Sequence, residues 1–226
     1  RASSGELRWL ALVLLAACTT REVRSGPPAP RDVTLFFTAE LRGYIGPCGC
    51  SENMRGGLSR AAFQVAEARK AGAVHVVDCG DGLFGEPTLP DAAVPQQERK
   101  AKTLAEAWKA MGLSVRAVGP LDDAREVEFR QSLGLPELAR GTFKVLDGVA
   151  VVSAATVAEA VKLAPAAKQA GGRAVIAIVP LPAEVLLREV LEAPGLDLVV
   201  SSRSKDAFAA EESRLAGGAT KVAHLE

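Results

Sequence analysis

Two short segments of the chain carry the residues best suited to chemistry, and both contain sulfur. Cys48 and Cys50 lie in Pro47-Cys48-Gly49-Cys50, and Cys79 lies in Asp78-Cys79-Gly80-Asp81. Extended residues two positions apart have Cα atoms up to about 6.8 Å apart, the upper limit for a disulfide, and a bend at Gly49 shortens this distance. A bridge across so small a loop is strained and easily reduced. The Cys-x-Cys spacing therefore favours a redox pair of thiols. Cys79 is the expected resolving thiol on the condition that the strands before the two segments are neighbours.

The same residues support two other interpretations. Cys48, Cys50, Cys79 and Asp81 are four ligands of the kinds that Zn²⁺ accepts, although Cys-x-Cys is a less usual zinc spacing than Cys-x-x-Cys. A structural disulfide between Cys79 and either Cys48 or Cys50 is the third interpretation, because cysteines of exported proteins often serve as staples. The chain has four cysteines and two histidines, so a histidine-rich metal centre is excluded. His75 lies within an apolar run, where we expect a hydrogen-bonded core position rather than a metal ligand.

Charged side chains occupy the same two regions of the chain. Glu40 and Arg42 follow an apolar run at residues 33–37, and Asp78 and Asp81 follow a second run at 73–77. A guanidinium beside a thiol favours the thiolate, so Arg42 is expected to lower the pKa of a nearby cysteine. Glu40, Asp78 and Asp81 are the carboxylates that could bind a residual divalent metal.

Alternating predicted strands and helices position these residues from about residue 32 onward. Apolar runs predict strands at 33–37, 73–77, 115–118, 174–179, 196–200 and 221–225, and helical spacing predicts helices at 58–70, 101–111, 156–170, 183–192 and 206–215. Asp147-Gly148, between two apolar runs, predicts a β-hairpin within 144–152. Asp122-Asp123 is expected to cap the next helix. The alternation predicts one α/β domain with a mostly parallel sheet and ligand sites at the carboxyl ends of the strands.

The two segments resemble the 5′-nucleotidase branch of the calcineurin-like metallophosphoesterases. Residues 38–43 are similar to that branch's Thr-Asn-Asp-Leu-His-Gly motif, residues 56–60 to its Gly-Gly-Leu-Ala-Arg helix start, and residues 78–81 to its Asp-Ala-Gly-Asp motif. The Pro-Cys-Gly-Cys loop resembles that of an exported variant of the family in which one cysteine is sometimes selenocysteine, and this implies a reactive site. The resemblance covers residues 33–204 and implies a layered α/β/β/α fold with a two-metal site.

Carried over residue by residue, the resemblance implies that this two-metal site is degenerate. Glu40 stands where the family has its first metal-binding Asp, Arg42 stands where it has a His, and Asp81 keeps the bridging Asp. The family's Asn-His pair falls on Pro120-Leu121, and no histidine stands at the later metal positions. Because two divalent ions need several carboxylate and imidazole ligands, we expect no ordinary two-metal phosphatase. The alternatives are residual phosphoesterase activity through Glu40, Asp78 and Asp81 with a divalent metal, and a non-catalytic binding module.

The first residues have the pattern of an export signal. Arg8 precedes the apolar run 9–17, whose roughly 14 Å of helix is too short to span a bilayer. Leu15-Ala16-Ala17-Cys18 resembles a bacterial lipobox, which implies lipidation of Cys18 and anchoring to a membrane. Thr19 after the cysteine implies a periplasm-facing position at the outer membrane. The alternative is an ordinary buried helix with a chance cysteine.

The expected organisation is a signal peptide at 1–17, a Pro-rich tether at 18–31 and one α/β domain at 32–226. Domains of the family usually extend further, so the resemblance implies more chain after residue 226. Lys plus Arg and Asp plus Glu number 27 each, and without a basic excess we expect no nucleic-acid partner. The expected partners are a membrane and a redox partner or small molecule that the sequence does not identify.

Overall fold

A four-stranded parallel sheet forms the amino-terminal half of the domain. The computed structural model describes residues 33–47, 57–182, 185, 193–201, 213–214 and 221–224. The strands of this first sheet follow chain order, and they are β1 (Val33–Thr38), β2 (Ala73–Asp78), β3 (Leu113–Ala117) and β4 (Glu137–Leu138). Because β1 and β2 are direct neighbours in parallel, their carboxyl ends lie side by side, as the sequence predicts.

A second, mixed sheet of six strands forms the carboxyl-terminal half. Its order is β5-β6-β7-β8-β10-β9, with bounds Thr142–Leu146, Val149–Ser153, Ala174–Val179, Leu198–Ser201, Lys221–His224 and Ser213–Arg214 in that order. Strands β5 and β6 form the predicted hairpin. Asp147 and Gly148 both have positive φ, at 48° and 87°, as a two-residue type I′ turn requires.

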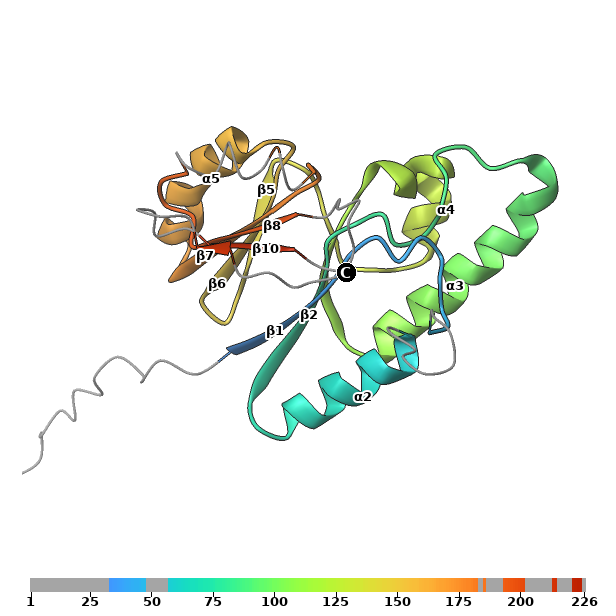
Figure 1. Ribbon diagram of the computed structural model, residues 1–226, viewed down its shortest axis with the longest axis horizontal. Coiled ribbons are helices and arrows are strands. Elements are labelled where there is room, and N and C mark those ends of the chain that lie inside the picture. Colours follow the sequence, from blue (N-terminus) through green and yellow to red (C-terminus); the bar gives the residue numbers. More distant parts are fainter. Residues whose placement is uncertain are drawn as a thin grey trace, which may run out of the picture. The chain divides into compact units, whose positions relative to one another are not determined.

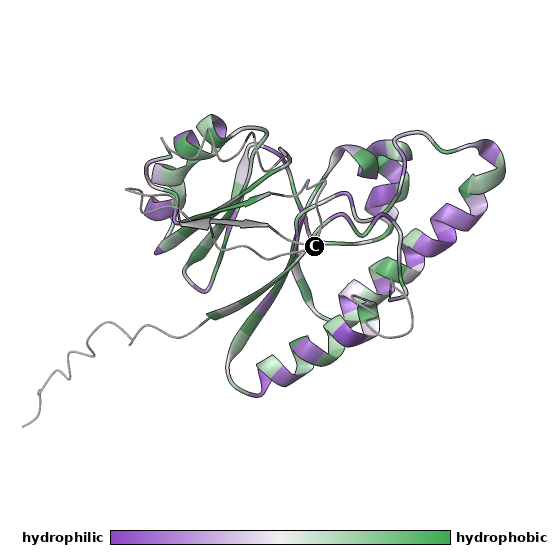
Figure 2. Ribbon diagram, in the orientation of Figure 1, coloured by the Kyte–Doolittle hydropathy of each residue, from purple (hydrophilic) through white to green (hydrophobic). Residues whose placement is uncertain are grey.

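Helices cover the outer faces of the two sheets, which gives four layers (Figure 1). Helices α2 (Leu58–Arg69) and α3 (Val94–Ala110, after the 3-10 turn η2, Asp91–Ala93) pack on the first sheet, and α5 (Val157–Gln169) packs on the second. In Figure 2, apolar and polar residues alternate along α2 and α3, as expected for helices with one face against a sheet. The predicted α/β/β/α arrangement is confirmed.

Alternation along the strands supplies separate apolar layers. Val77 of β2 and Ile176 and Ile178 of β7 lie in the layer between the sheets, whereas Val76 packs toward α3 and Val175 toward α5. This two-residue period is the reason that each strand can serve two cores at once.

Several elements differ from the sequence predictions. The predicted helix at 206–215 is wrong at its end, because Ser213–Arg214 forms β9 and pairs antiparallel with β10. Short elements between β3 and β5 were not predicted: η3 (Pro120–Ala124), α4 (Val127–Ser132) and β4. The signal peptide, the tether and most of the predicted helix at 183–192 lie outside the described residues. Within the described part of the chain, no helix combines the length and the hydropathy needed to cross a membrane.

Candidate functional site

The loop after β1 runs alongside the loop after β2 and is joined to it by backbone hydrogen bonds. The Glu40 N–H donates to the Gly80 carbonyl at 3.1 Å, and the Arg42 N–H donates to the Asp81 carbonyl at 3.1 Å. At the base of the two loops, the Cys79 N–H donates to the Thr38 carbonyl at 2.7 Å. The structure therefore brings together the backbones of the predicted site residues Glu40, Arg42, Asp78, Cys79 and Asp81.

The loop after β3 completes this edge of the sheet. Asp81 Oδ1 accepts the Leu121 N–H at 2.7 Å, and the Asp81 N–H donates to Asp122 Oδ2 at 2.9 Å. Gly119 lies so close that an added Cβ would be 2.2 Å from Asp81 Oδ1. Only glycine fits at this position, because any side chain would collide with the Asp81 carboxylate.

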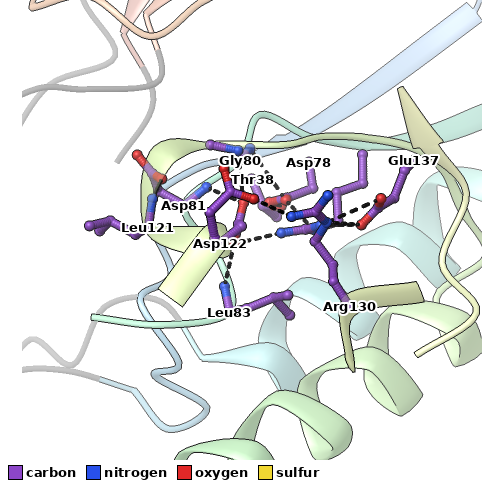
Figure 3. Close-up of polar contacts among 12 residues, drawn as sticks. Thr38, Asp78, Gly80, Asp81, Leu83, Leu121, Asp122, Arg130 and Glu137 are labelled. Carbon is purple, nitrogen blue, oxygen red and sulfur yellow. Dashed lines mark hydrogen bonds and ion pairs between the residues drawn. The ribbon is translucent and has the colours of Figure 1, made fainter. Parts of the chain in front are cut away.

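Arg116 of β3 lies at the centre of a buried ion-pair cluster beneath these loops. Its side chain is fully buried and contacts three carboxylates: Nε lies 3.3 Å from Asp78, Nη2 lies 2.5 Å from Asp122 and Nη1 lies 3.0 Å from Glu137. The side chains of Asp78 and Asp122 are also fully buried. Figure 3 shows Asp78, Asp122 and Glu137 converging on one point below the loops. The cluster therefore neutralises carboxylates that would otherwise carry unpaired buried charge.

The cluster continues outward through a second guanidinium. Arg130 of α4 contacts Glu137 at 3.0 Å through Nε and pairs with Asp123 through Nη1. The Arg116 guanidinium carbon lies 5.7 Å from the ring centre of Trp108, within the range of a cation–π contact. Helix α3, strand β3, strand β4 and helix α4 thus all contribute to holding the same charges.

Asp122 links the cluster to the loops. Its Oδ2 accepts the Gly119 N–H at 2.9 Å in addition to the Asp81 N–H, and its Oδ1 accepts the Leu83 N–H at 3.0 Å. The prediction that Asp122-Asp123 caps the next helix is wrong, because the N-cap of α4 is Glu126. Asp122 lies within the turn η3 instead and accepts the N–H of Gly119, the residue that begins this turn. Its wider role was missed, because the sequence does not reveal that loop amides 39 to 41 residues away share the same carboxylate.

Asp78 is a buried carboxyl with a strongly shifted pKa. Burial raises the pKa of Asp78 to about 7, and the nearby Asp122 also raises it, while the Arg116 guanidinium and hydrogen bonds from Thr38 and Gly80 act in the opposite direction. The Thr38 hydroxyl donates to Oδ1 at 2.8 Å, and the Gly80 N–H donates to Oδ2 at 3.3 Å. Both carboxyl oxygens of Asp78 are therefore engaged inside the protein.

Glu40 and Arg42 lie closer to the surface and pair with one another. Arg42 Nη2 lies 3.3 Å from Glu40 Oε2, and the Arg42 side chain is 45% exposed. Glu40, Arg42 and Asp81 have positive φ angles of 48°, 48° and 55°, which non-glycine residues seldom adopt. Strained backbone of this kind tends to gather at functional sites, and here it gathers where the loops meet.

Cys79 lies in the apolar layer between the two sheets. It is 2% exposed and packs in a cluster with Val77, Val115, Ile178 and other apolar residues. Burial raises the pKa of the Cys79 thiol well above its usual range, and the neighbouring Asp78 raises it further. The expected lowering of a cysteine pKa by Arg42 is therefore wrong for Cys79. The convergence of Cys79 with Cys48 and Cys50 stays a prediction, since these two residues, like Cys18, lie outside the described part of the chain.

The described residues do not fit a two-metal centre. Among them, no group of three or more His, Cys, Asp or Glu side chains is placed to hold a metal ion. Pro120 and Leu121 offer no ligating side chain beside Asp81, and Arg42 places a positive charge in the first loop. His75 lies elsewhere on β2 and is hydrogen-bonded there as predicted, but its side chain is 18% exposed and does not belong to the core. The proposed zinc set of Cys48, Cys50, Cys79 and Asp81 is not tested, because half of its ligands lie outside the described residues.

Comparisons with known proteins place the fold. No protein-family model matches the sequence, and no curated protein matches it. Among solved structures, the chain is similar to Thermus thermophilus sulfate thiohydrolase SoxB, with a TM-score of 0.64 and 12% identity over 88% of this chain and 52% of that chain. It is also similar to the Haemophilus influenzae NAD nucleotidase NadN, with a TM-score of 0.56 and 15% identity over 77% of this chain and 38% of that one.

A shorter protein matches over most of its length. The calcineurin-like phosphoesterase YfkN of Bacillus subtilis has a TM-score of 0.54 and 15% identity, over 84% of this chain and 80% of that chain. By contrast, this chain spans about half or less of SoxB and NadN. At these identities the likeness shows the fold alone. The α/β/β/α layers and the loops that meet after β1, β2 and β3 therefore belong to a domain with the fold of the calcineurin-like phosphoesterases and nucleotidases.

Proposed function

We propose that this chain is an exported phosphoesterase-fold domain that does not hydrolyse phosphate esters with two metal ions, and that its Cys48–Cys50 loop carries out thiol chemistry. The observation that carries the first part is the ion-pair cluster on Arg116, which engages both Asp78 and Asp122. A carboxylate already neutralised by a buried guanidinium can ligate a cation only after that pair is broken. Breaking such a pair costs about 3–5 kcal/mol.

The remaining carboxylates of the site do not replace the lost ligands. Glu40 is paired with Arg42, whose charge repels a dication, and Asp81 Oδ1 accepts the Leu121 N–H. Two divalent ions a few ångströms apart need more oxygen and nitrogen ligands than these two side chains supply. We therefore derive no catalytic step through a metal ion.

The thiol proposal rests on the Cys-x-Cys sequence itself and on the described residues that flank it. The Leu58 N–H donates to the Ile45 carbonyl at 3.2 Å, and Gly57 lies so close to Pro47 that an added Cβ would be 3.1 Å from the Pro47 nitrogen. Pro47 and Gly57, the described residues on either side of the segment that contains Cys48 and Cys50, therefore lie close together. Because Cys79 is buried with a raised pKa, we assign the exchange to Cys48 and Cys50 and give Cys79 a packing role.

The thiol step is a two-electron exchange. Oxidation of Cys48 and Cys50 to a disulfide releases two protons and two electrons, and a disulfide of a partner protein accepts them as it becomes a dithiol. Thiol titration of the purified chain before and after mild reductant should show two thiols that oxidise and reduce together. Cys48→Ser should abolish the reversible change, whereas the control Cys79→Ala should keep it. A chain whose thiol count does not respond to redox buffers would refute this part of the proposal.

A hydrolysis assay tests the other part. We expect no Mn²⁺- or Zn²⁺-stimulated hydrolysis of nucleoside monophosphates or bis(p-nitrophenyl) phosphate by the folded chain, and less than one bound metal ion per chain. An active 5′-nucleotidase serves as the positive control. Metal-stimulated hydrolysis that Asp81→Asn removes would instead establish the residual phosphoesterase. If neither activity is found, the domain is a binding module.

We also propose that Cys18 anchors the protein to the outer membrane, facing the periplasm. The proposal rests on the lipobox-like sequence before Cys18 and the Pro-rich segment after it. Mass spectrometry of the membrane fraction should find an acylated N-terminal Cys18, and Cys18→Ala should release the protein into the soluble fraction. An unmodified Cys18 in a membrane-bound chain would contradict this assignment.

A further inference from the structure

A Ser–His–Asp arrangement joins strands β2 and β3 of the first sheet to the hairpin turn of the second sheet, apart from the loops described above. We infer that Ser114, His75 and Asp147 form a nucleophilic serine site that reacts with activated esters of small acyl groups. Ser114 belongs to β3, His75 to β2 and Asp147 to the turn between β5 and β6. This inference does not depend on the proposed function, because it shares no residue with that site.

The three side chains form one continuous hydrogen-bond chain. Ser114 Oγ lies 3.1 Å from His75 Nδ1, and His75 Nε2 lies 3.0 Å from Asp147 Oδ2. In the tautomer with its proton on Nε2, His75 donates to Asp147 and accepts from the Ser114 hydroxyl. These are the contacts that a nucleophile, a general base and an orienting carboxylate require, and either ring nitrogen can act as the base when the other donates to a carboxylate.

The backbone at Ser114 departs from regular strand geometry. In the pairing of β2 with β3, Val76 faces Leu113 and Val77 faces Val115, so Ser114 is the extra residue where the register shifts. Such a bulge re-aims the side chain of the inserted residue, and bulges are frequent beside active sites. Here the inserted residue is the one whose hydroxyl meets His75, so the irregularity of the sheet and the polar contact coincide.

The carboxylate is held by a turn of defined geometry. Asp147 has a φ of 48° in the type I′ turn, and Arg173 Nη2 donates to its backbone carbonyl at 3.2 Å. Lys144 Nζ donates to the Ser114 carbonyl at 2.9 Å, which places a positive charge next to the serine. Asp147 therefore reaches His75 from the second sheet with its own position fixed.

The exposure of the group suits a small reagent. The His75 side chain is 18% exposed and that of Asp147 is 62% exposed, and Ser114 is partly exposed. Because Ser114 lies within a paired strand and is only partly exposed, the inferred site suits a small acyl group. An ester with a good leaving group needs little further stabilisation of the leaving oxygen.

The reaction balances in two steps. Ser114 Oγ bonds to the ester carbonyl carbon as its proton passes to His75, and the bond to the leaving alcohol breaks as that alcohol takes the proton from His75. Water then attacks the acyl-serine, His75 accepts its proton, and the acid is released as Ser114 regains a hydrogen. Asp147 acts as a positioning residue for the histidine throughout.

Covalent labelling of the intact chain tests the inference. A small fluorophosphonate probe should add one equivalent to the wild-type chain, and peptide mapping should place the adduct on Ser114. Ser114→Ala should remove the adduct, while Ser132→Ala, which changes an exposed serine whose hydroxyl donates to the Phe129 carbonyl, should keep it. His75→Gln should slow labelling about 100-fold or more, the usual contribution of a general base.

A second series separates positioning by Asp147 from a structural role. Asp147→Asn should slow labelling of Ser114 by about tenfold or more, because the imidazole loses its orienting carboxylate. Asp147→Glu should recover part of the rate, and circular dichroism should find both variants folded. p-Nitrophenyl acetate should give a burst of one p-nitrophenolate per chain. No adduct on Ser114 in the wild-type chain, or equal labelling rates in the wild type and Asp147→Asn, would overturn the inference.

Discussion

Replacing Arg116 with methionine is the sharpest test of the buried cluster. Methionine keeps much of the apolar stem but removes the charge that contacts Asp78, Asp122 and Glu137. Glu137 keeps its ion pair with Arg130 at 3.0 Å, so it loses only one of its two cationic partners. Asp78 and Asp122 are left fully buried without a cation.

The expected loss in the free energy of unfolding follows from the cost of protonating a buried carboxylate that has lost its cation. A buried aspartate that loses its cation escapes the desolvation penalty by taking up a proton, and each pH unit above its ordinary pKa of 3.8 costs about 1.4 kcal/mol. At pH 7 this amounts to about 4 kcal/mol for one aspartate, close to the 3–5 kcal/mol typical of a broken buried pair. Asp78, whose pKa is already raised to about 7, is half protonated at that pH and adds little.

The same reasoning predicts how the loss depends on pH. At pH 5 the protonation cost falls to about 2 kcal/mol, so Arg116→Met should be less damaging there than at pH 7. Urea unfolding in the presence of EDTA, followed by Trp108 fluorescence and circular dichroism at both pH values, measures the two free energies of unfolding.

A more exposed ion pair provides the matched control. Arg125 is 27% exposed and pairs with Glu98 at 3.0 Å and with Glu126 at 3.1 Å. Arg125→Met should cost about 1 kcal/mol or less and show little dependence on pH. A loss below about 1 kcal/mol for Arg116→Met at pH 7, or an equal loss at pH 5 and pH 7, would refute the view that Arg116 neutralises this site.

Three further predictions concern the same edge of the sheet. The raised pKa of Asp78 means that the folded chain keeps a proton that the unfolded chain loses, so the free energy of unfolding should fall as pH rises from about 4 to about 7. In thermal unfolding with EDTA, Asp78→Asn should make this pH dependence weaker. An unchanged pH dependence in the variant would contradict the prediction. Gly119→Ala should cost about 2 kcal/mol or more in urea unfolding because its Cβ would meet Asp81 Oδ1, whereas Gly46→Ala, with no atom within 4 Å of the added carbon, should be nearly neutral. In a variant with serine in place of Cys18, Cys48 and Cys50, the buried thiol of Cys79 should react with Ellman's reagent only after unfolding. Rapid reaction in the folded variant would show that the Cys79 thiol is not buried.

Local sequence patterns were sufficient for most of the architecture. The apolar runs before Glu40 and Asp81 predict two strands, and the rule that parallel neighbours end at one edge predicts that their loops meet. Asp147-Gly148 predicts the hairpin because two consecutive positive φ angles suit few residue pairs. The individual strands and the hairpin depend on residues close together in the chain, so the order of residue types alone determines them, whereas the pairing of β1 with β2 joins residues 40 positions apart.

Some elements could not be predicted because their stability comes from distant partners. Strand β4 has two residues, too few for any periodic signal, and it forms because Arg116 and Ala117 pair with Glu137 and Leu138. Strand β9 likewise depends on its pairing with β10. In such segments, hydrogen bonds to a neighbouring strand override the local preference.

What the sequence by itself determined is the alternation of strands and helices and the edge of the sheet at which the first loops gather. The tertiary structure alone decided the partners of the buried charges and of the serine. Arg116 is a lone cation within a predicted apolar strand, and only folding brings Asp78 from 38 residues away to its side. Ser114, His75 and Asp147 are likewise separated by 39 and 72 residues. An electrostatic or hydrogen-bonded contact depends on distance in space, and over such separations the position of a residue in the chain carries no information about it.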